Sequence, residues 1–292
     1  GLGCADCHYS PADLWIRSRL NQVIAETRDA IEHYRFDLAS SAIYDFTWNE
    51  YCDWYLELAK ISLQSDDEKL QRGTRQTLVT VLETLLRLAH PIIPFITEEI
   101  WQRVAPLAGT TAATIMLQAY PEQEDINIEN GTQAVTQINW VMDFILGIRR
   151  IRGEMNIAPG KPLQVLLQNG NELDRQNYDN TLNYLLKLGR IESIQWLESN
   201  DNAPESAIAL VGDLKILIPM KGLIDKQAEL SRLEKEIQRI EKDLPRIEGK
   251  LNNPAFVDKA PEDVISKERE KLAGLQSSLD NLRIQHAKIS ML

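Results

Sequence analysis

The fold of this chain is decided by the stretch His90-Pro91-Ile92-Ile93-Pro94-Phe95-Ile96-Thr97-Glu98-Glu99-Ile100-Trp101-Gln102. Just before it, leucines and Val81 recur at helical spacing up to Leu88, which predicts an amphipathic helix. His90-Pro91 ends that helix, because proline has no N–H and disfavours helical backbone in the residue before it. Thr97-Glu98-Glu99 then places carboxylates at the positive end of a new helix dipole, so we expect the next helix to begin there.

The sequence around this corner predicts more helices of the same kind. Ser10-Pro11-Ala12-Asp13 is a helix start, because Ser10 can cap, Pro11 suits the first helical position and Asp13 complements the dipole. A second helix is expected over residues 38–63, and Asp66-Asp67 can start the third. Helices with one apolar face pack against one another, which predicts an antiparallel bundle.

The period of the apolar residues changes after the bundle. Residues 106–136 are loop-rich with one apolar run at Thr114–Leu117, and a helix is expected over residues 137–154. Short strands are expected at 163–167, 194–197, 207–210 and 214–218, with a helix at 178–188 and a tight turn at 211–213. These elements predict a small α+β module.

The last block is a helical hairpin. Apolar residues step by three and four from Leu230 to Leu251, which is the period of a coiled-coil seam. The same steps recur from Ile265 to Ile289, with Glu268 and His286 at two of the positions. The loop around Pro254 is too short for parallel helices, so the pair should be antiparallel within one chain. Pro245 removes a backbone hydrogen bond inside the first helix and should kink it, at a cost of roughly 3 kcal/mol.

The fold class is therefore mainly α: an antiparallel helical bundle, a small α+β junction module and a C-terminal antiparallel coiled-coil hairpin. We expect an N-terminal tail at 1–9, the bundle at 10–136, the junction at 137–222 and the hairpin arm at 223–292.

Charge and cysteine content exclude several classes of protein. The net charge of −11 argues against a non-specific nucleic-acid binder. The charge is uneven, however: residues from Lys221 onward hold 14 Lys/Arg and 13 Asp/Glu, whereas residues 1–220 hold 18 Lys/Arg and 30 Asp/Glu. The C-terminal region is therefore the less repulsive surface for a phosphate backbone. No apolar run is long enough to span a bilayer and no leader is evident, so we expect a cytoplasmic chain that contacts no membrane. Three cysteines suit a reducing compartment.

Four segments resemble the aminoacyl-tRNA synthetases for valine, isoleucine and leucine. Tyr51-Cys52-Asp53-Trp54-Tyr55-Leu56-Glu57 looks like the second bundle helix of the valyl enzymes, and the His90–Gln102 corner is shared more widely. Residues 148–161 (IRRIRGEMNIAPGK) are similar to the valyl junction, and residues 250–261 (KLNNPAFVDKAP) look like the tip of the valyl coiled-coil arm. Gly153 and Pro245 depart from the usual pattern.

The resemblance implies the tRNA-binding C-terminal portion of a valine–tRNA ligase, with valine-specific tRNA as partner and a monomeric state. No segment looks like the family's catalytic nucleotide fold or editing domain, so this portion alone should be inactive. We expect no cofactor on it, since ATP and Mg²⁺ would bind the catalytic domain, and no catalytic or metal-binding residue.

Basic residues in two regions are the candidate tRNA contacts. At the helix end near residue 150 they could contact phosphates or simply complement the helix dipole. On the arm, many could equally be solvated partners of neighbouring glutamates. The candidates are Arg149, Arg150, Arg152, Lys161, Lys235, Arg239, Lys242, Arg246, Lys250, Lys259, Lys267 and Arg269.

Five aromatic residues could stack unpaired bases of an RNA loop, although core packing explains most of them better at helical spacing. They are Trp48, Tyr51, Trp54, Tyr55 and Trp101.

Two other readings stay open. The first is a coiled-coil protein-interaction module without nucleic-acid binding. The second is an electron-transfer protein built on Cys4-Ala5-Asp6-Cys7-His8, which matches the Cys-Xaa-Xaa-Cys-His pattern of c-type haem attachment. The same segment could instead hold zinc or be an incidental tail, because so short a pattern is easily matched by chance.

Overall fold

The bundle begins where Ser10 caps helix α1 (Pro11–Glu32). The Ser10 hydroxyl accepts from the Asp13 amide at 3.1 Å, and the Asp13 carboxylate accepts from the Ser10 amide at 2.9 Å. This reciprocal pair is a capping box, and Pro11 occupies the first helical turn as predicted. The computed structural model describes residues 6–123, 131–198, 201–220, 226–253 and 262–291.

The second helical stretch runs from Phe36 to Leu63 in three parts. It comprises α2 (Phe36–Asp45), a π-helical segment η1 (Phe46–Tyr55) and α3 (Leu56–Leu63). The predicted helix at 38–63 is confirmed, but its π-helical centre was not foreseen. A π turn shifts side chains around the helix by one position, and its residues Tyr51, Trp54 and Tyr55 all point into the core.

Helix α4 (Glu68–Ala89) and helix α5 (Pro94–Val104) meet at the predicted corner. Asp67 caps α4 by accepting from the amides of Lys69 and Leu70, and α4 ends just before His90. The expectation that the next helix starts at Thr97 is wrong: α5 starts at Pro94, because proline fits the first helical turn, where its missing N–H leaves no bond unmade.

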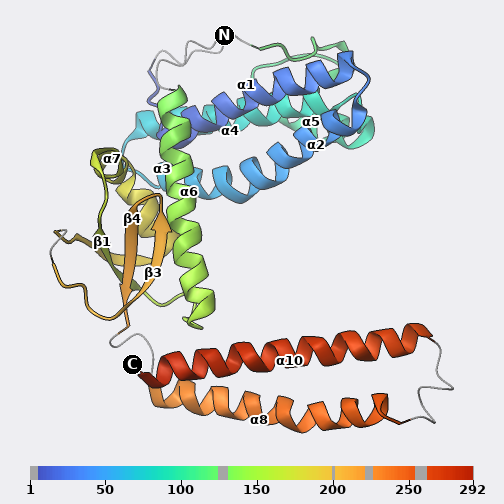
Figure 1. Ribbon diagram of the computed structural model, residues 1–292. Helices are drawn as coiled ribbons and strands as arrows, with labels where there is room; N and C mark the ends of the chain where they lie inside the picture. The colour runs from blue at the N-terminus through green and yellow to red at the C-terminus, as the bar shows by residue number, and fades with distance from the viewer. Residues whose placement is uncertain (1–5, 124–130, 199–200, 221–225, 254–261, 292) are drawn as a thin grey trace.

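The helices enclose a main apolar core and a smaller second cluster. The largest fully buried side chains of the main core in the bundle include Trp15, Tyr55 and Phe46, while Trp101 anchors the second cluster between α4 and α5. Figure 1 shows that α2 lies antiparallel to α1 and that α4 lies antiparallel to α3, as the amphipathic pattern predicts. The short apolar run before the next helix forms one 3₁₀ turn, η2 (Ile115–Leu117), with Ile115 buried.

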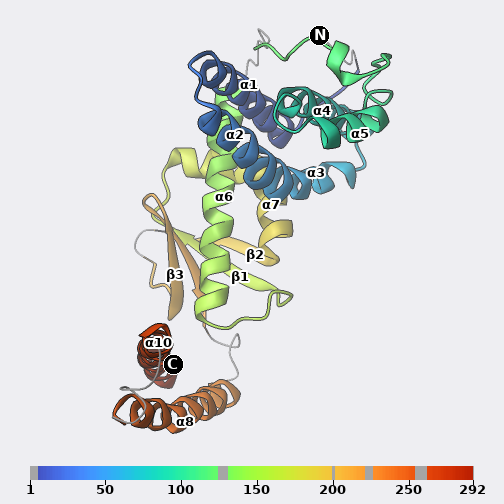
Figure 2. The ribbon, with the colours of Figure 1, turned by 90° about the vertical axis from the view of Figure 1, so that its right-hand side faces the viewer.

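Helix α6 (Gly131–Glu154) connects the bundle to the sheet. It packs on α1 at one end and on the sheet at the other, as Figures 1 and 2 show. It starts six residues before the expected Gln137, so a domain boundary after residue 136 would fall inside this helix. The other domain boundaries stay predictions.

The junction module is a four-stranded mixed sheet with one crossover helix. Strands β2 (Ile191–Trp196), β1 (Leu163–Gln168), β4 (Leu214–Pro219) and β3 (Ser206–Val211) lie in that order. Strands β1 and β2 are parallel and joined by α7 (Glu172–Gly189), whereas β4 is antiparallel to both of its neighbours. Gly212 has φ +56°, which allows the tight turn between β3 and β4. All four expected strands are confirmed, with slightly different ends.

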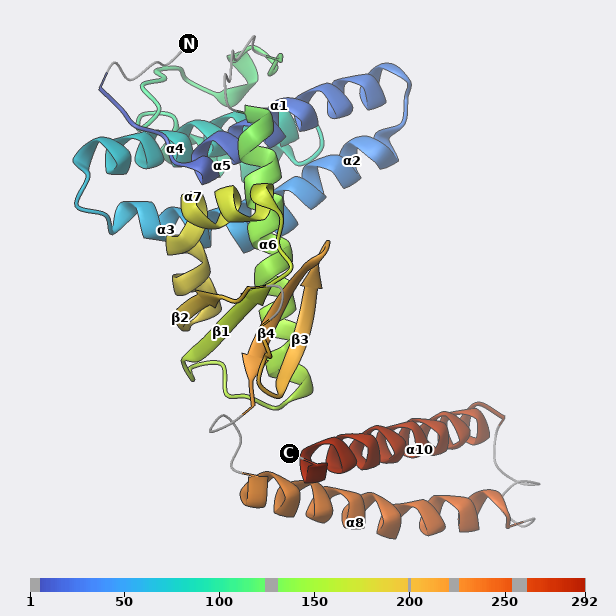
Figure 3. The ribbon, with the colours of Figure 1, turned by 60° about the vertical axis from the view of Figure 1, so that its left-hand side comes forward.

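The arm consists of α8 (Lys226–Leu251) and α10 (Glu262–Met291), which run antiparallel beyond the sheet (Figure 3). Helix α8 continues through Pro245, which lies on an exposed face. None of the helices in the described ranges is long and apolar enough to cross a membrane.

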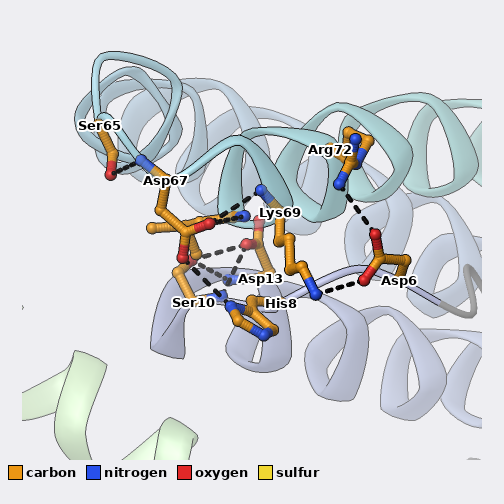
Figure 4. Close-up of polar contacts among 9 residues, drawn as sticks. Asp6, His8, Ser10, Asp13, Ser65, Asp67, Lys69 and Arg72 are labelled. Atoms are coloured by element: carbon orange, nitrogen blue, oxygen red, sulfur yellow. Dashed lines mark hydrogen bonds and ion pairs between the residues drawn. The ribbon is translucent and has the colours of Figure 1, made fainter.

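The N-terminal segment is attached to α4 (Figure 4). The Asp6 carboxylate pairs with Lys69 at 2.5 Å and with Arg72 at 3.1 Å, and His8 Nδ1 lies 3.1 Å from the Asp67 carboxylate. The His8 amide also donates to the Lys69 carbonyl at 3.1 Å. Residues 6–9 are therefore packed on the bundle, while Cys4 of the Cys-Xaa-Xaa-Cys-His pattern lies outside the described residues.

Gly73 permits this attachment, which gives a test of it. A Cβ at residue 73 would fall 2.0 Å from the His8 carbonyl oxygen, whereas a Cβ at Gly153 of α6 would meet nothing within 4 Å. We expect Gly73→Ala to lower the free energy of unfolding by about 1–3 kcal/mol, because backbone must move. Gly153→Ala should raise it by up to about 1 kcal/mol through helix propensity.

Near-UV circular dichroism during urea unfolding is the measurement, because all six tryptophans lie before residue 200 and report on the bundle and junction. If Gly73→Ala and Gly153→Ala stabilised the protein equally, residues 6–9 would not be packed against α4 as described.

Candidate nucleic-acid interface

The two arm helices meet along the predicted heptad seam. Leu233, Ile240, Ile247 and Leu279 are all less than 10% exposed. The predicted coiled-coil period is therefore confirmed where the side chains are described.

Acidic residues beside the seam on α8 are matched by basic residues on α10. Glu241 pairs with Arg283 at 2.7 Å, and Glu234 lies 3.5 Å from His286. Each of these glutamates comes one residue after a seam residue, so it lies on the flank that faces α10. The charged side chains beside the seam therefore pair with one another within the arm.

The outer face of α8 carries a row of cations, which we call the α8 basic row: Lys235, Arg239, Lys242 and Arg246. Each follows a seam residue by two positions, about 200° around the helix, so the row lies opposite α10. All four side chains are exposed, and no ion pair to another described residue is recorded for them. The row is continuous because its members are spaced by four, three and four residues.

The remaining arm candidates differ from this row. Lys250 pairs with Glu268 of α10 at 3.3 Å, so its charge is partly used within the arm. Lys267 and Arg269 are exposed on α10, and Lys259 lies outside the described residues. The outer face of α10 continues from Lys267 with Glu270, Gly274, Ser277 and Asn281 and holds no basic row.

The basic residues at the end of α6 lie in different environments. The Arg149 guanidinium lies 5.1 Å from the Trp54 ring centroid, a cation–π contact, and Arg150 is exposed with Glu154 at 4.0 Å. Both guanidinium groups remain at the surface. Lys161 is half-buried in the turn that precedes β1 and has its own contacts within the chain.

Arg152 points inward, which argues against its predicted role as a phosphate contact. Its side chain donates to the carbonyl oxygens of Ala158 at 3.1 Å, Gly189 at 3.0 Å and Arg190 at 3.3 Å. The residue is 9% exposed, and burial lowers its pKa. Arg152 therefore fastens the end of α6 to the turn between α7 and β2.

Four of the five aromatic candidates are core residues, as their helical spacing favoured. Tyr51, Trp54, Tyr55 and Trp101 are buried, and Trp101 donates to Glu83 at 2.9 Å. Only Trp48, on η1, is exposed among them, at 57%. A buried ring cannot stack a base without unpacking the bundle, so Trp48 is the one of the five that stays available.

The corner between α4 and α5 exposes a further aromatic residue, which helical spacing did not single out. Phe95 is 90% exposed, and Ile92, Ile93 and Ile96 around it are also exposed. The corner itself is held from inside, because the Thr97 hydroxyl donates to the Ile93 carbonyl at 2.8 Å and its oxygen, Oγ1, lies 2.8 Å from His90 Nδ1. The proline-flanked position of Phe95, at the first turn of α5, was the available signal.

The internal role of Arg152 can be tested by stability. Arg152→Met should lower the free energy of unfolding by about 2–4 kcal/mol, because three carbonyl groups lose a charged donor. Arg150→Met removes the same charge from an exposed neighbour and should change it by less than about 0.5 kcal/mol. Urea unfolding followed by near-UV circular dichroism measures both, and equal effects would refute the internal role.

Two protein families match this chain in the same order as the structural parts. The anticodon-binding domain of tRNA ligase matches residues 13–167, from α1 to β1. The valyl tRNA synthetase tRNA binding arm matches residues 225–290, which are the two arm helices. The first match covers more than half of the 292 residues. The chain therefore belongs to the anticodon-binding family of tRNA ligases, and with its valyl-type arm it is the tRNA-binding C-terminal part of a valine–tRNA ligase.

Proposed function

We propose that this chain binds valine-accepting tRNA as a monomer in the cytoplasm. In this proposal the α8 basic row contacts the phosphate backbone, and the exposed rings at the bundle surface stack on unpaired bases. The single observation that carries the proposal is the α8 basic row, because four exposed cations follow one face of α8 and form no ion pair with another described residue.

The physical case for a phosphate partner starts from repulsion within the row. Like charges three and four residues apart on a helix destabilise it by a few tenths of a kcal/mol per pair. A row of phosphates opposite these side chains would remove that repulsion and release counterions, which makes binding favourable and dependent on salt. A protein partner of the coiled-coil type would instead require an apolar outer face.

The net charge of −11 does not oppose this arrangement. At physiological ionic strength charges more than about 8 Å apart at the surface are largely screened. The acidic excess lies in residues 1–220, whereas the row lies at one face of the arm. The local electrostatic potential around the α8 basic row, and not the net charge of the whole chain, therefore decides where a polyanion can approach.

Base contacts are proposed at the corner between α4 and α5. Phe95 offers an unobstructed ring, and stacking on an aromatic face tolerates any base. Trp48 on η1 offers a second exposed ring. Arg149 and Arg150 provide exposed guanidinium groups for nearby phosphates.

The α8 basic row can be tested with charge-matched triple variants. Lys235→Gln, Arg239→Gln and Lys242→Gln together should lower the salt slope of tRNA binding by about three, one unit per lost phosphate contact, for every tRNA species. Gly274→Asp, Ser277→Asp and Asn281→Asp change the net charge equally on the outer face of α10 and should leave the slope near the wild-type value. Filter binding of an unmodified valine tRNA transcript between 50 and 200 mM salt measures both. An equal decrease of the salt slope in both triple variants would mean that only the net charge of the arm matters for binding.

Stacking on Phe95 can be separated from general apolar contact. Phe95→Leu keeps an apolar side chain but removes the ring, and should weaken tRNA binding by about 1–3 kcal/mol. Phe95→Tyr keeps the ring and should retain most of the affinity. Neither should alter stability, because the side chain is 90% exposed. Unchanged binding by Phe95→Leu would exclude a stacking role.

A further inference from the structure

Helices α1 and α4 form a half-open cavity of about 470 Å³ on the bundle surface. Arg17, Leu20 and Ile24 line it from one face of α1, at i, i+3 and i+7. Thr80, Val81 and Thr84 line it from the facing side of α4. Leu20, Ile24 and Val81 are buried and make an apolar floor, whereas Arg17 and the two threonines stand partly exposed at its walls. A cavity of this size lies in the range of small-ligand sites.

One end of the cavity is closed by residues 119–123, which cross from α4 to α1. Arg87 donates to the Ala119 carbonyl at 2.8 Å, and Arg28 donates to the Pro121 carbonyl at 3.0 Å. The Tyr120 hydroxyl donates to the Leu88 carbonyl at 3.1 Å. These bonds fix the end wall, so the cavity is preformed.

Arg17 is the cation of the cavity that has no acidic partner among the described residues. Its guanidinium carbon lies 4.9 Å from the Tyr9 ring centroid, a cation–π contact that uses no N–H donor in a hydrogen bond. Arg87, by contrast, is neutralised by Glu83 at 2.9 Å. The Thr80 hydroxyl has no hydrogen-bond partner within the described chain. The Glu122 carboxylate also lines the cavity, at its end wall, and pairs with Arg28 at 3.7 Å. The cavity thus combines one positive charge without an acidic partner, a free hydroxyl and an apolar floor.

We infer that this cavity holds one unpaired nucleotide of the bound RNA. The phosphate lies on the Arg17 edge, the flat base lies on the floor of Leu20, Ile24 and Val81, and the Thr80 hydroxyl bonds to the base or sugar. A planar guanidinium suits a phosphate because it can donate two parallel hydrogen bonds. The inference rests on the proposed function for its ligand, since tRNA supplies nucleotides that are unpaired in loops.

The test uses the full chain with three single substitutions. Arg17→Met removes the charge and donors but keeps a stem to cover Tyr9. Thr80→Leu fills the cavity with a good helix former and costs no recorded hydrogen bond. Arg75→Met is the matched control, because Arg75 is an exposed arginine of α4 outside the cavity, bonded to Gln71 only at 2.8 Å. Thermal unfolding by circular dichroism verifies that all three fold.

The probes are the unmodified valine tRNA transcript and fluorescein-labelled pentauridylate, measured by anisotropy at 100 mM salt. We expect Arg17→Met and Thr80→Leu to weaken transcript binding about tenfold or more, with Arg75→Met like wild type. Wild-type affinity in both cavity variants, while the α8 triple variant is still weakened, would overturn the cavity site and leave the proposed function standing.

If the wild-type chain fails to bind the transcript, the proposed function fails and pentauridylate decides the cavity. Saturable binding that Arg17→Met abolishes would support a nucleotide site, and no binding would overturn it. Binding of an acidic pentapeptide through Arg17, without RNA binding, would identify a peptide groove and also overturn the inference.

Discussion

The buried carboxylate of Asp13 is the constraint on which the bundle depends. The residue is fully buried, and its oxygens accept from the Ser10 amide at 2.9 Å, the Tyr55 hydroxyl at 2.7 Å and the Thr74 hydroxyl at 2.8 Å. A buried carboxylate is tolerated only when its lone pairs are satisfied, so the start of α1, the end of η1 and the first half of α4 must stay in register. Burial, with the neighbouring Asp13, raises the pKa of Tyr55 and keeps its hydroxyl a donor. The faces of α1 and α4 that line the cavity follow from this fixed register.

Part of this arrangement could be predicted from the sequence, and part could not. Ser10-Pro11-Ala12-Asp13 gives the start of α1 because capping is local. The same pattern cannot show that Asp13 also meets Tyr55 and Thr74, because those contacts join residues 42 and 61 positions away. The arm was the most predictable part, since its heptads encode both the seam and the outer face. The π-helical centre at Phe46–Tyr55 was hidden because α and π turns place apolar residues at nearly the same spacing.

The candidate site was harder to predict than the fold for a related reason. Arg152 and Arg150 are two residues apart on one helix, and only packing shows that the first donates to three carbonyls while the second is exposed. Aromatic spacing correctly favoured the core for most of the rings, but it gave no weight to Phe95, whose exposure results from the corner made by Pro91 and Pro94. Exposure is a tertiary property, so residue type alone could not rank these candidates.

Helix α6 sets the distance between the bundle and the sheet. Its 24 residues extend about 36 Å and pack on α1 at one end and on β3 and β4 at the other. Trp140 donates to Asp174 at 2.8 Å and Arg152 clamps the far end, so α6, α7 and the sheet form a continuous packed unit with the bundle. When two surfaces engage one ligand, a rigid spacer that matches the ligand raises the effective concentration of the second contact. Under the proposed function, the fixed spacing that α6 gives between the bundle and the sheet would therefore favour simultaneous contacts with one RNA, although α6 itself would not touch it.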